Sequence, residues 1–285
     1  PKHFFPVSLR GYNDGDFTMV IGYPGNTERY MTSFEVKELM EVTHPNRIAI
    51  RGLRQDILMK DMLADEAITI KYASKYSSSS NYWKFSIGQS KGLKALKIYD
   101  KKQQLEREFG DWTNADGARK SKYGEALNLI NEAVTSRRPY QHALQYISEC
   151  LFNGSEIVGF AGKATALYNA LLKEPDNRQK IDSLSTELKT LGEEFYREYN
   201  ESTDRKVTPA LLKLFYEKVP APFRPDFFTV IQSKYKGNVD YYCVNLFNRS
   251  VFANSYDFTI FIQNPSRKTL EKDMAFVAAL TTQKK

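Results

Sequence analysis

The chain has 285 residues, of which 41% are hydrophobic and 13% aromatic, a composition that supports a sizeable core and argues against intrinsic disorder. Lysine and arginine (41) outnumber the acidic residues (34), and the net charge of +7 raises nucleic acid as a partner. The two signs are interspersed without a long basic block, which favours solvated helix faces, and no apolar run is long enough to cross a bilayer.

The first 31 residues carry strand signals. Aromatic and β-branched residues at 4–9 and 16–22 are bounded by glycine, asparagine and aspartate, as in short strands. Residues 23–26, Tyr-Pro-Gly-Asn, predict a turn, because proline presets φ and glycine and asparagine accept positive φ. Two strands do not make an independent sheet, so we interpret residues 1–31 as a small β remnant of something larger.

From residue 32 onward the hydrophobic spacing is helical. Thr32 and Glu35 form a capping-box pattern, which predicts a helix that starts there and ends near Val42. The chain is expected to restart at Pro45, and apolar residues then recur at helical spacing and continue weakly to Tyr72.

The four serines at 77–80 predict an interruption, as either a flexible linker or a tight break between helices. A second long helical segment is expected from about Asn81 to Trp112. Thr208-Pro209 is a good N-cap and first-turn pair, which predicts a helix from there to about Lys218. Further helices are predicted at about 118–135, 139–153, 155–173 and 176–201, with shorter ones after Pro225. The fold class expected for this chain is therefore mainly α.

One motif resembles a catalytic element. Residues 88–92, Gly-Gln-Ser-Lys-Gly, match the G-x-S-x-G nucleophile elbow, in which a strained strand-to-helix turn exposes the serine. No alternation of strands and helices surrounds Ser90, and the only histidine downstream is His142, in a helical stretch. We therefore interpret Ser90 as structural, and a hydrolase that uses Ser90 as nucleophile is the weaker hypothesis.

Metal and cofactor signatures are not found in the sequence. It has no P-loop, no dinucleotide fingerprint and no zinc motif, and no metal-ligand spacing links Cys150 or Cys243 to a histidine. Both cysteines have apolar or aromatic neighbours, which predicts two buried thiols. We expect no metal and no cofactor, and we expect the chain on its own to be inactive as an enzyme.

Residues 16–30, Asp-Phe-Thr-Met-Val-Ile-Gly-Tyr-Pro-Gly-Asn-Thr-Glu-Arg-Tyr, follow the pattern D-F-x-x-x-x-G-[YF]-P-G-x-T-x-R-[YF]. This pattern resembles the segment that ends the first barrel half of bacterial dipeptidyl-peptidases VII and XI. Residues 72–74, 80–84, 87–88 and 270–273 are similar to the same family in collinear order. The resemblance therefore spans nearly the whole chain.

The resemblance implies a chymotrypsin-like double β-barrel with a Ser-His-Asp triad and a helical domain inserted between the barrel halves. Residues 1–31 would be the end of the first half, and residues 32–285 the helical cap domain. The triad histidine and aspartate would precede this region and the serine would follow it, so no catalytic residue is assigned here. His3, His44 and His142 match no catalytic position. Both ends of the chain resemble cuts inside a longer polypeptide.

The family binds the free N-terminus of its substrate with an asparagine of the helical domain, and Asn81 is the position that matches. A helix N-cap after residues 77–80 is the structural alternative for this residue. Tyr82 and Trp83 either line the cleft or pack in the core.

The resemblance implies a serine-type dipeptidyl-peptidase whose partners are peptides with a free N-terminus and the catalytic barrels of the same polypeptide. It implies a periplasmic or secreted enzyme and leaves a homodimer of the full-length protein open. The alternative is a basic all-helical binding module for nucleic acid or a protein partner.

Overall fold

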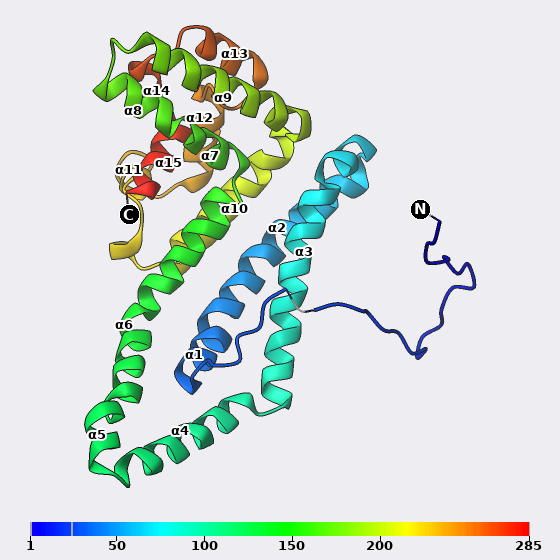
Figure 1. Ribbon diagram of the computed structural model, residues 1–285. Coiled ribbons are helices and arrows are strands. Elements are labelled where there is room, and N and C mark those ends of the chain that lie inside the picture. Colours follow the sequence, from blue (N-terminus) through cyan, green and yellow to red (C-terminus); the bar gives the residue numbers. More distant parts are fainter. Residues whose placement is uncertain (1, 24, 285) are drawn as a thin grey trace. The chain divides into compact units, whose positions relative to one another are not determined.

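The computed structural model describes residues 2–23 and 25–284, which form two units, Pro1–Met31 and Thr32–Lys285. The larger unit is built from α-helices (Figure 1), so the mainly α expectation is confirmed. None of the described helices is both long and apolar enough to span a membrane.

The smaller unit contains no strand within residues 2–23 and 25–31, so the structure does not show the expected β remnant. The side chains of residues 2–23 and 25–30 are exposed, and a local turn is closed by the backbone N–H of Asn13, which donates to the Asp16 carboxylate at 2.8 Å. Strands need partners to satisfy their backbone groups, and this unit offers none by itself. The turn predicted at 23–26 includes Pro24, which lies outside the described residues.

The larger unit begins with one continuous helical run made of α1 (Ser33–Glu38), a π-helical turn (Leu39–Thr43) and α2 (His44–Ala64). The predicted capping box is confirmed, because the Thr32 N–H donates to the Glu35 carboxylate at 2.8 Å and the Glu35 N–H donates to the Thr32 hydroxyl at 3.4 Å. The predicted restart at Pro45 is a π-turn rather than a break. In this π-turn the N–H of His44 donates to the carbonyl of Leu39, directly before Pro45, which has no N–H to donate.

The second long helix, α3 (Glu66–Ala95), runs through the four serines, so the predicted interruption at 77–80 is wrong. Serine costs roughly 0.5 kcal/mol relative to alanine in a helix interior, or about 2 kcal/mol for four. Ser79 and Ser80 are buried on α3, which packs along α2 (Figure 1). Tertiary packing therefore overrides the weak local propensity.

The single helix expected from Asn81 to Trp112 is instead divided in two. α3 ends at Ala95, Lys97 adopts a left-handed conformation with φ of 50°, and α4 (Ile98–Asn114) follows. Lysine is not a residue that favours positive φ, so composition alone did not indicate this boundary.

The remaining helices complete the larger unit. They are α5 (Gly117–Tyr123), α6 (Ala126–Tyr146), a π-helical segment (Ile147–Phe152), α7 (Glu156–Ala161), a 3₁₀ turn (Gly162–Ala164), α8 (Thr165–Lys173), α9 (Arg178–Glu198), α10 (Glu201–Lys218), a 3₁₀ turn (Ala221–Phe223), α11 (Phe227–Lys234), α12 (Val239–Arg249), α13 (Ser255–Gln263), α14 (Arg267–Lys272) and α15 (Met274–Gln283).

The predicted N-cap at Thr208 is wrong, because α10 begins at Glu201 and contains Pro209 in its interior. Asn200 caps the helix with its side chain on the N–H of Thr203 at 2.9 Å. The Thr208 hydroxyl instead donates to the buried carboxylate of Asp204 at 2.8 Å. α6 likewise continues through Pro139, where two separate helices were expected.

The core of the larger unit is rich in aromatic rings. Phe160 of α7 stacks on Phe195 of α9 with 4.2 Å between ring centroids. Cys150 and Cys243 are free thiols buried in this core, which confirms the interpretation from their apolar neighbours.

Candidate functional site

Asn81 lies in the interior of α3 with an exposed side chain. Its amide makes no side-chain hydrogen bond with any residue that the structure describes. The helix N-cap reading of Asn81 is wrong, because α3 is capped by Asp65, whose carboxylate accepts the N–H of Ala67 at 2.8 Å. An exposed amide without a protein partner keeps its carbonyl oxygen available as an acceptor for a ligand.

The two aromatic residues after Asn81 differ in their surroundings. The Trp83 indole donates to the backbone carbonyl of Ile48 at 3.1 Å, and a Cβ on Gly52 would lie 3.3 Å from its Nε1. Trp83 is therefore a packing residue between α2 and α3. Tyr82 is 50% exposed, and the Arg51 guanidinium lies 5.1 Å from its ring centroid.

Arg51 joins three segments of the larger unit. Its Nε and Nη2 lie 2.8 and 3.0 Å from the two carboxylate oxygens of Glu149, in the π-helical segment Ile147–Phe152. Its Nη1 donates to the backbone carbonyl of Ser79 in α3 at 3.3 Å. The sequence shows no signal for this pairing, because Arg51 and Glu149 are 98 positions apart.

Ser90 does not lie in a nucleophile elbow, because residues 88–92 are part of α3. Its hydroxyl lies 2.8 Å from Nδ1 of the buried His44, a pairing that the sequence did not indicate because His44 lies 46 positions upstream. Burial, and secondarily the charge of Arg47, lowers the pKa of His44, which favours the neutral ring. The helical backbone around Ser90 already uses its N–H groups, so it offers no oxyanion hole. The pair connects the start of α2 to the later part of α3.

His142 also has a structural role. Its Nδ1 lies 3.0 Å from the Asn46 amide nitrogen, and its Nε2 lies 3.0 Å from the backbone carbonyl of Lys218. These contacts tie α6 to α2 and to the end of α10. His3 lies exposed in the smaller unit.

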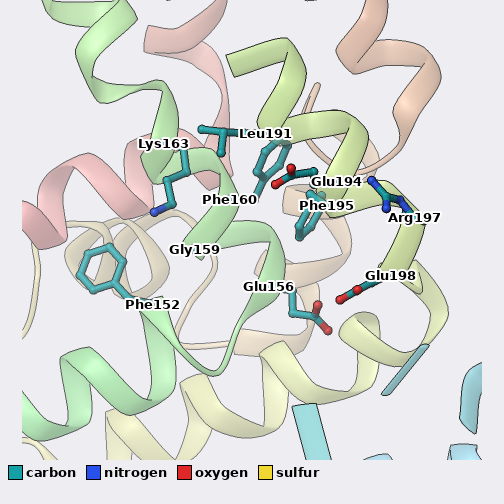
Figure 2. Close-up of a pocket in the computed structure, with 10 residues that line it drawn as sticks. All are labelled: Phe152, Glu156, Gly159, Phe160, Lys163, Leu191, Glu194, Phe195, Arg197 and Glu198. Atoms are coloured by element: carbon teal, nitrogen blue, oxygen red, sulfur yellow. The ribbon is translucent and has the colours of Figure 1, made fainter. Parts of the chain in front are cut away.

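A hollow of about 530 Å³ lies between α7 and α9 (Figure 2), and Asn81 is not among the residues that line it. It is lined by the stacked Phe160 and Phe195 and by charged side chains of both signs, which are Glu156, Lys163, Glu194, Arg197 and Glu198. One of these, Glu156, pairs with Lys75 of α3 at 2.5 Å. None of the residues singled out from the sequence lines this hollow, and its charges of both signs select no particular ligand.

A buried carboxylate, Asp204, lies beside this hollow and was not singled out from the sequence. It accepts the backbone N–H groups of Glu156 at 3.1 Å and Ile157 at 2.8 Å, together with the Thr208 hydroxyl. Burial, and secondarily the neighbouring Glu156 charge, raises the pKa of Asp204 to about 7. The cluster joins α7 to α10, and its contacts satisfy the carboxylate from within the fold.

Comparison with known proteins defines the class to which this helical chain belongs. The whole chain, residues 1–285, matches the Peptidase S46 family, and the chain belongs to that family.

Its relatives include two kinds of dipeptidyl-peptidase. The chain is 39% identical over 280 residues to dipeptidyl-peptidase 7 of Porphyromonas gingivalis, covering 96% of this chain and 38% of the relative. It is 31% identical over 285 residues to the Asp/Glu-specific dipeptidyl-peptidase of Flavobacterium psychrophilum, covering 98% and 39%. The chain thus spans less than half the length of these relatives.

Among solved structures, DPP11 of Porphyromonas endodontalis in complex with the dipeptide Arg-Glu has the same fold in the matching region. The TM-score is 0.79 at 26% sequence identity, and the match covers 92% of this chain and 37% of that one. The helical architecture is therefore that of a part of an S46 peptidase.

Proposed function

We propose that this chain is the substrate-capping domain of a serine-type dipeptidyl-peptidase that releases dipeptides from peptide N-termini. Membership of the S46 family and the similarity to two kinds of dipeptidyl-peptidase support this function over a basic helical binding module. In this proposal the serine, histidine and aspartate of the triad belong to the part of the enzyme that the chain does not span.

Residues 1–31 are, in the same proposal, the end of the first peptidase barrel half. Their strand-like sequence then acquires its hydrogen-bond partners from the rest of that barrel. The exposed apolar side chains of this segment, such as Phe5 and Val20, are consistent with a segment that packs against further chain.

The proposed role of the cap is to close the cleft and help bind the substrate's free α-ammonium group two residues before the scissile bond. A cation in a partly enclosed site needs hydrogen-bond acceptors, and the side-chain carbonyl of an asparagine provides one. The observation that carries this assignment is the exposed amide of Asn81, which lies in a helix interior and makes no side-chain hydrogen bond to residues 2–23 or 25–284.

The assignment is tested in the complete enzyme with the variants Asn81→Ala and Asn81→Asp. We expect Asn81→Ala to lower kcat/KM for a dipeptidyl fluorogenic substrate by about tenfold or more, the effect of losing one charge-assisted hydrogen bond. Asn81→Asp keeps an acceptor oxygen and should retain more activity than the alanine variant.

The matched control is Asn169→Ala, since Asn169 is another exposed asparagine within a helix, α8, and its side chain makes no hydrogen bond to the described residues. Equal kcat/KM values for the wild type and Asn81→Ala would remove Asn81 from the binding site.

We further propose that the complete enzyme is exported and acts on peptides in the periplasm or outside the cell. Cell fractionation followed by detection of the enzyme is the direct test. Recovery of the active enzyme only in the cytoplasm would contradict it.

A further inference from the structure

The stretch of α3 that carries Asn81 is held against α2 by its buried face. Residues two apart in a helix lie about 200° apart around its axis, so Ser79 and Asn81 occupy roughly opposite faces. Ser79 is buried toward α2, whereas Asn81 is exposed. The position of Asn81 therefore depends on the contacts that the buried, opposite face of α3 makes with α2.

That buried face is secured by side chains of α2. The Gln55 amide donates to the Ser79 hydroxyl at 3.3 Å, and Arg51 donates to the Ser79 carbonyl at 3.3 Å. One turn further along, the Trp83 indole bonds to the Ile48 carbonyl. These bonds flank Asn81, which directly follows the four serines at 77–80. The low helix propensity of serine gives the backbone before Asn81 little stiffness of its own.

Arg51 differs from the other two contacts because it extends the attachment to a third segment. Its side chain is 16% exposed and that of Glu149 is 10% exposed, and the two form a two-bond pair. Only a guanidinium has the planar fork that reaches both carboxylate oxygens while a third nitrogen donates to Ser79. A lysine has a single ammonium group, which does not reach both the Glu149 carboxylate and the Ser79 carbonyl in this geometry.

We propose that Arg51, oriented by Glu149, is a positioning residue for Asn81 and thereby controls how tightly the substrate's N-terminal ammonium is bound. The inference rests on the proposed function of Asn81. Arg51 itself lies on the buried side of α3 and acts through the backbone of residues 79–82, with its guanidinium also beside the Tyr82 ring.

The test is a double-mutant cycle in the complete enzyme, comparing Arg51→Lys, Asn81→Ala and the double variant. Arg51→Lys should raise KM and the inhibition constant of the product dipeptide about tenfold while kcat changes less than about twofold. In the Asn81→Ala background the same Arg51→Lys change should raise KM by less than about twofold, because the group that Arg51 positions is already gone.

Two further variants separate positioning from folding. Glu149→Gln should reproduce the KM effect of Arg51→Lys with Arg51 still present, and it serves in its place if the lysine variant does not fold. Arg54→Lys, on the same helix, is the matched control, because Arg54 makes no side-chain hydrogen bond or ion pair to the residues that the structure describes.

The outcomes distinguish the two proposals. If Asn81→Ala raises KM and Arg51→Lys adds its full effect on top, the positioning role is overturned while the binding role of Asn81 stands. If Arg51→Lys and Glu149→Gln lower only thermal stability and leave KM unchanged, the positioning role is also overturned. If Asn81→Ala leaves KM unchanged, the proposed function of Asn81 fails first, and the inference fails with it.

Discussion

The carboxylate of Asp204 accepts the backbone N–H of Ile157 at 2.8 Å, so a side chain of α10 caps the first turn of α7 from 47 positions away. The flanking Ser155 does not cap α7 with its own hydroxyl, which instead lies 2.7 Å from the Thr208 hydroxyl. The start of α7 thus depends on a tertiary contact where a local cap would be usual.

The burial of Asp204 should make stability depend on pH in an unusual direction, because burial raises the pKa of this carboxyl more than its hydrogen bonds lower it. The pKa of Asp204 is about 7 in the folded chain against 3.8 as the ordinary value, so the folded state binds the proton more tightly. The stabilisation is therefore fully present below about pH 4 and is lost as the pH rises through about 7. The charge of Glu156, which pairs with Lys75 of α3, raises the pKa of Asp204 further.

Urea denaturation of the chain and of Asp204→Asn between pH 4 and 7 measures this effect. The free energy of unfolding of the wild type, minus that of the variant, should fall with rising pH by roughly 1 kcal/mol per pH unit. Asp182→Asn is the control, because Asp182 is exposed on α9. A difference that stays constant or grows with pH would contradict the raised pKa.

Replacement by alanine should change the free energy of unfolding in opposite directions at two glycines. A Cβ on Gly192 of α9 would lie 2.3 Å from a ring carbon of Phe258, so Gly192→Ala should lower the free energy of unfolding by about 1–3 kcal/mol. A Cβ on Gly110 of α4 meets nothing within 4 Å, so Gly110→Ala should raise it by up to about 1 kcal/mol. Thermal or urea unfolding of both variants checks the pair, and the same sign for both would refute the packing argument.

The serine run in α3 offers a second matched pair. Ser78 is exposed, so Ser78→Ala should stabilise the chain by roughly 0.5 kcal/mol through helix propensity. Ser79→Ala removes the hydroxyl that accepts the buried Gln55 amide, and the loss of this bond should make it destabilising by about 1 kcal/mol. If Ser79→Ala proves as stabilising as Ser78→Ala, the bond to Gln55 does not hold α3.

Both cysteines should be unreactive in the native chain. Burial raises the pKa of the Cys150 and Cys243 thiols, so little thiolate forms and none is accessible. A thiol reagent at pH 8 should label neither residue within minutes, and both after unfolding in guanidinium. Rapid labelling of either cysteine in the native chain would show that its part of the core opens.

Local features were largely predictable from the sequence. The capping box at Thr32 and Glu35 was found as expected. The helix predicted at 176–201 is α9, which spans Arg178–Glu198. Both predictions depend only on neighbours a few positions away in the sequence. The same local rules failed at residues 77–80, at Pro139 and at Thr208-Pro209, where long helices continue through unfavourable residues. Burial against other helices outweighs an unfavourable propensity of about 2 kcal/mol for the four serines and of roughly 3 kcal/mol for each proline.

For the candidate site, too, some features could be predicted from the sequence and others could not. Asn81 and the family to which the chain belongs could be proposed from sequence, because the family's motifs are short, collinear runs of residues. The pairings of Arg51 with Glu149, of His44 with Ser90 and of Asp204 with Ile157 were decided only by tertiary structure. Each joins residues tens of positions apart on different helices, and which faces of those helices meet depends on the packing of the whole unit.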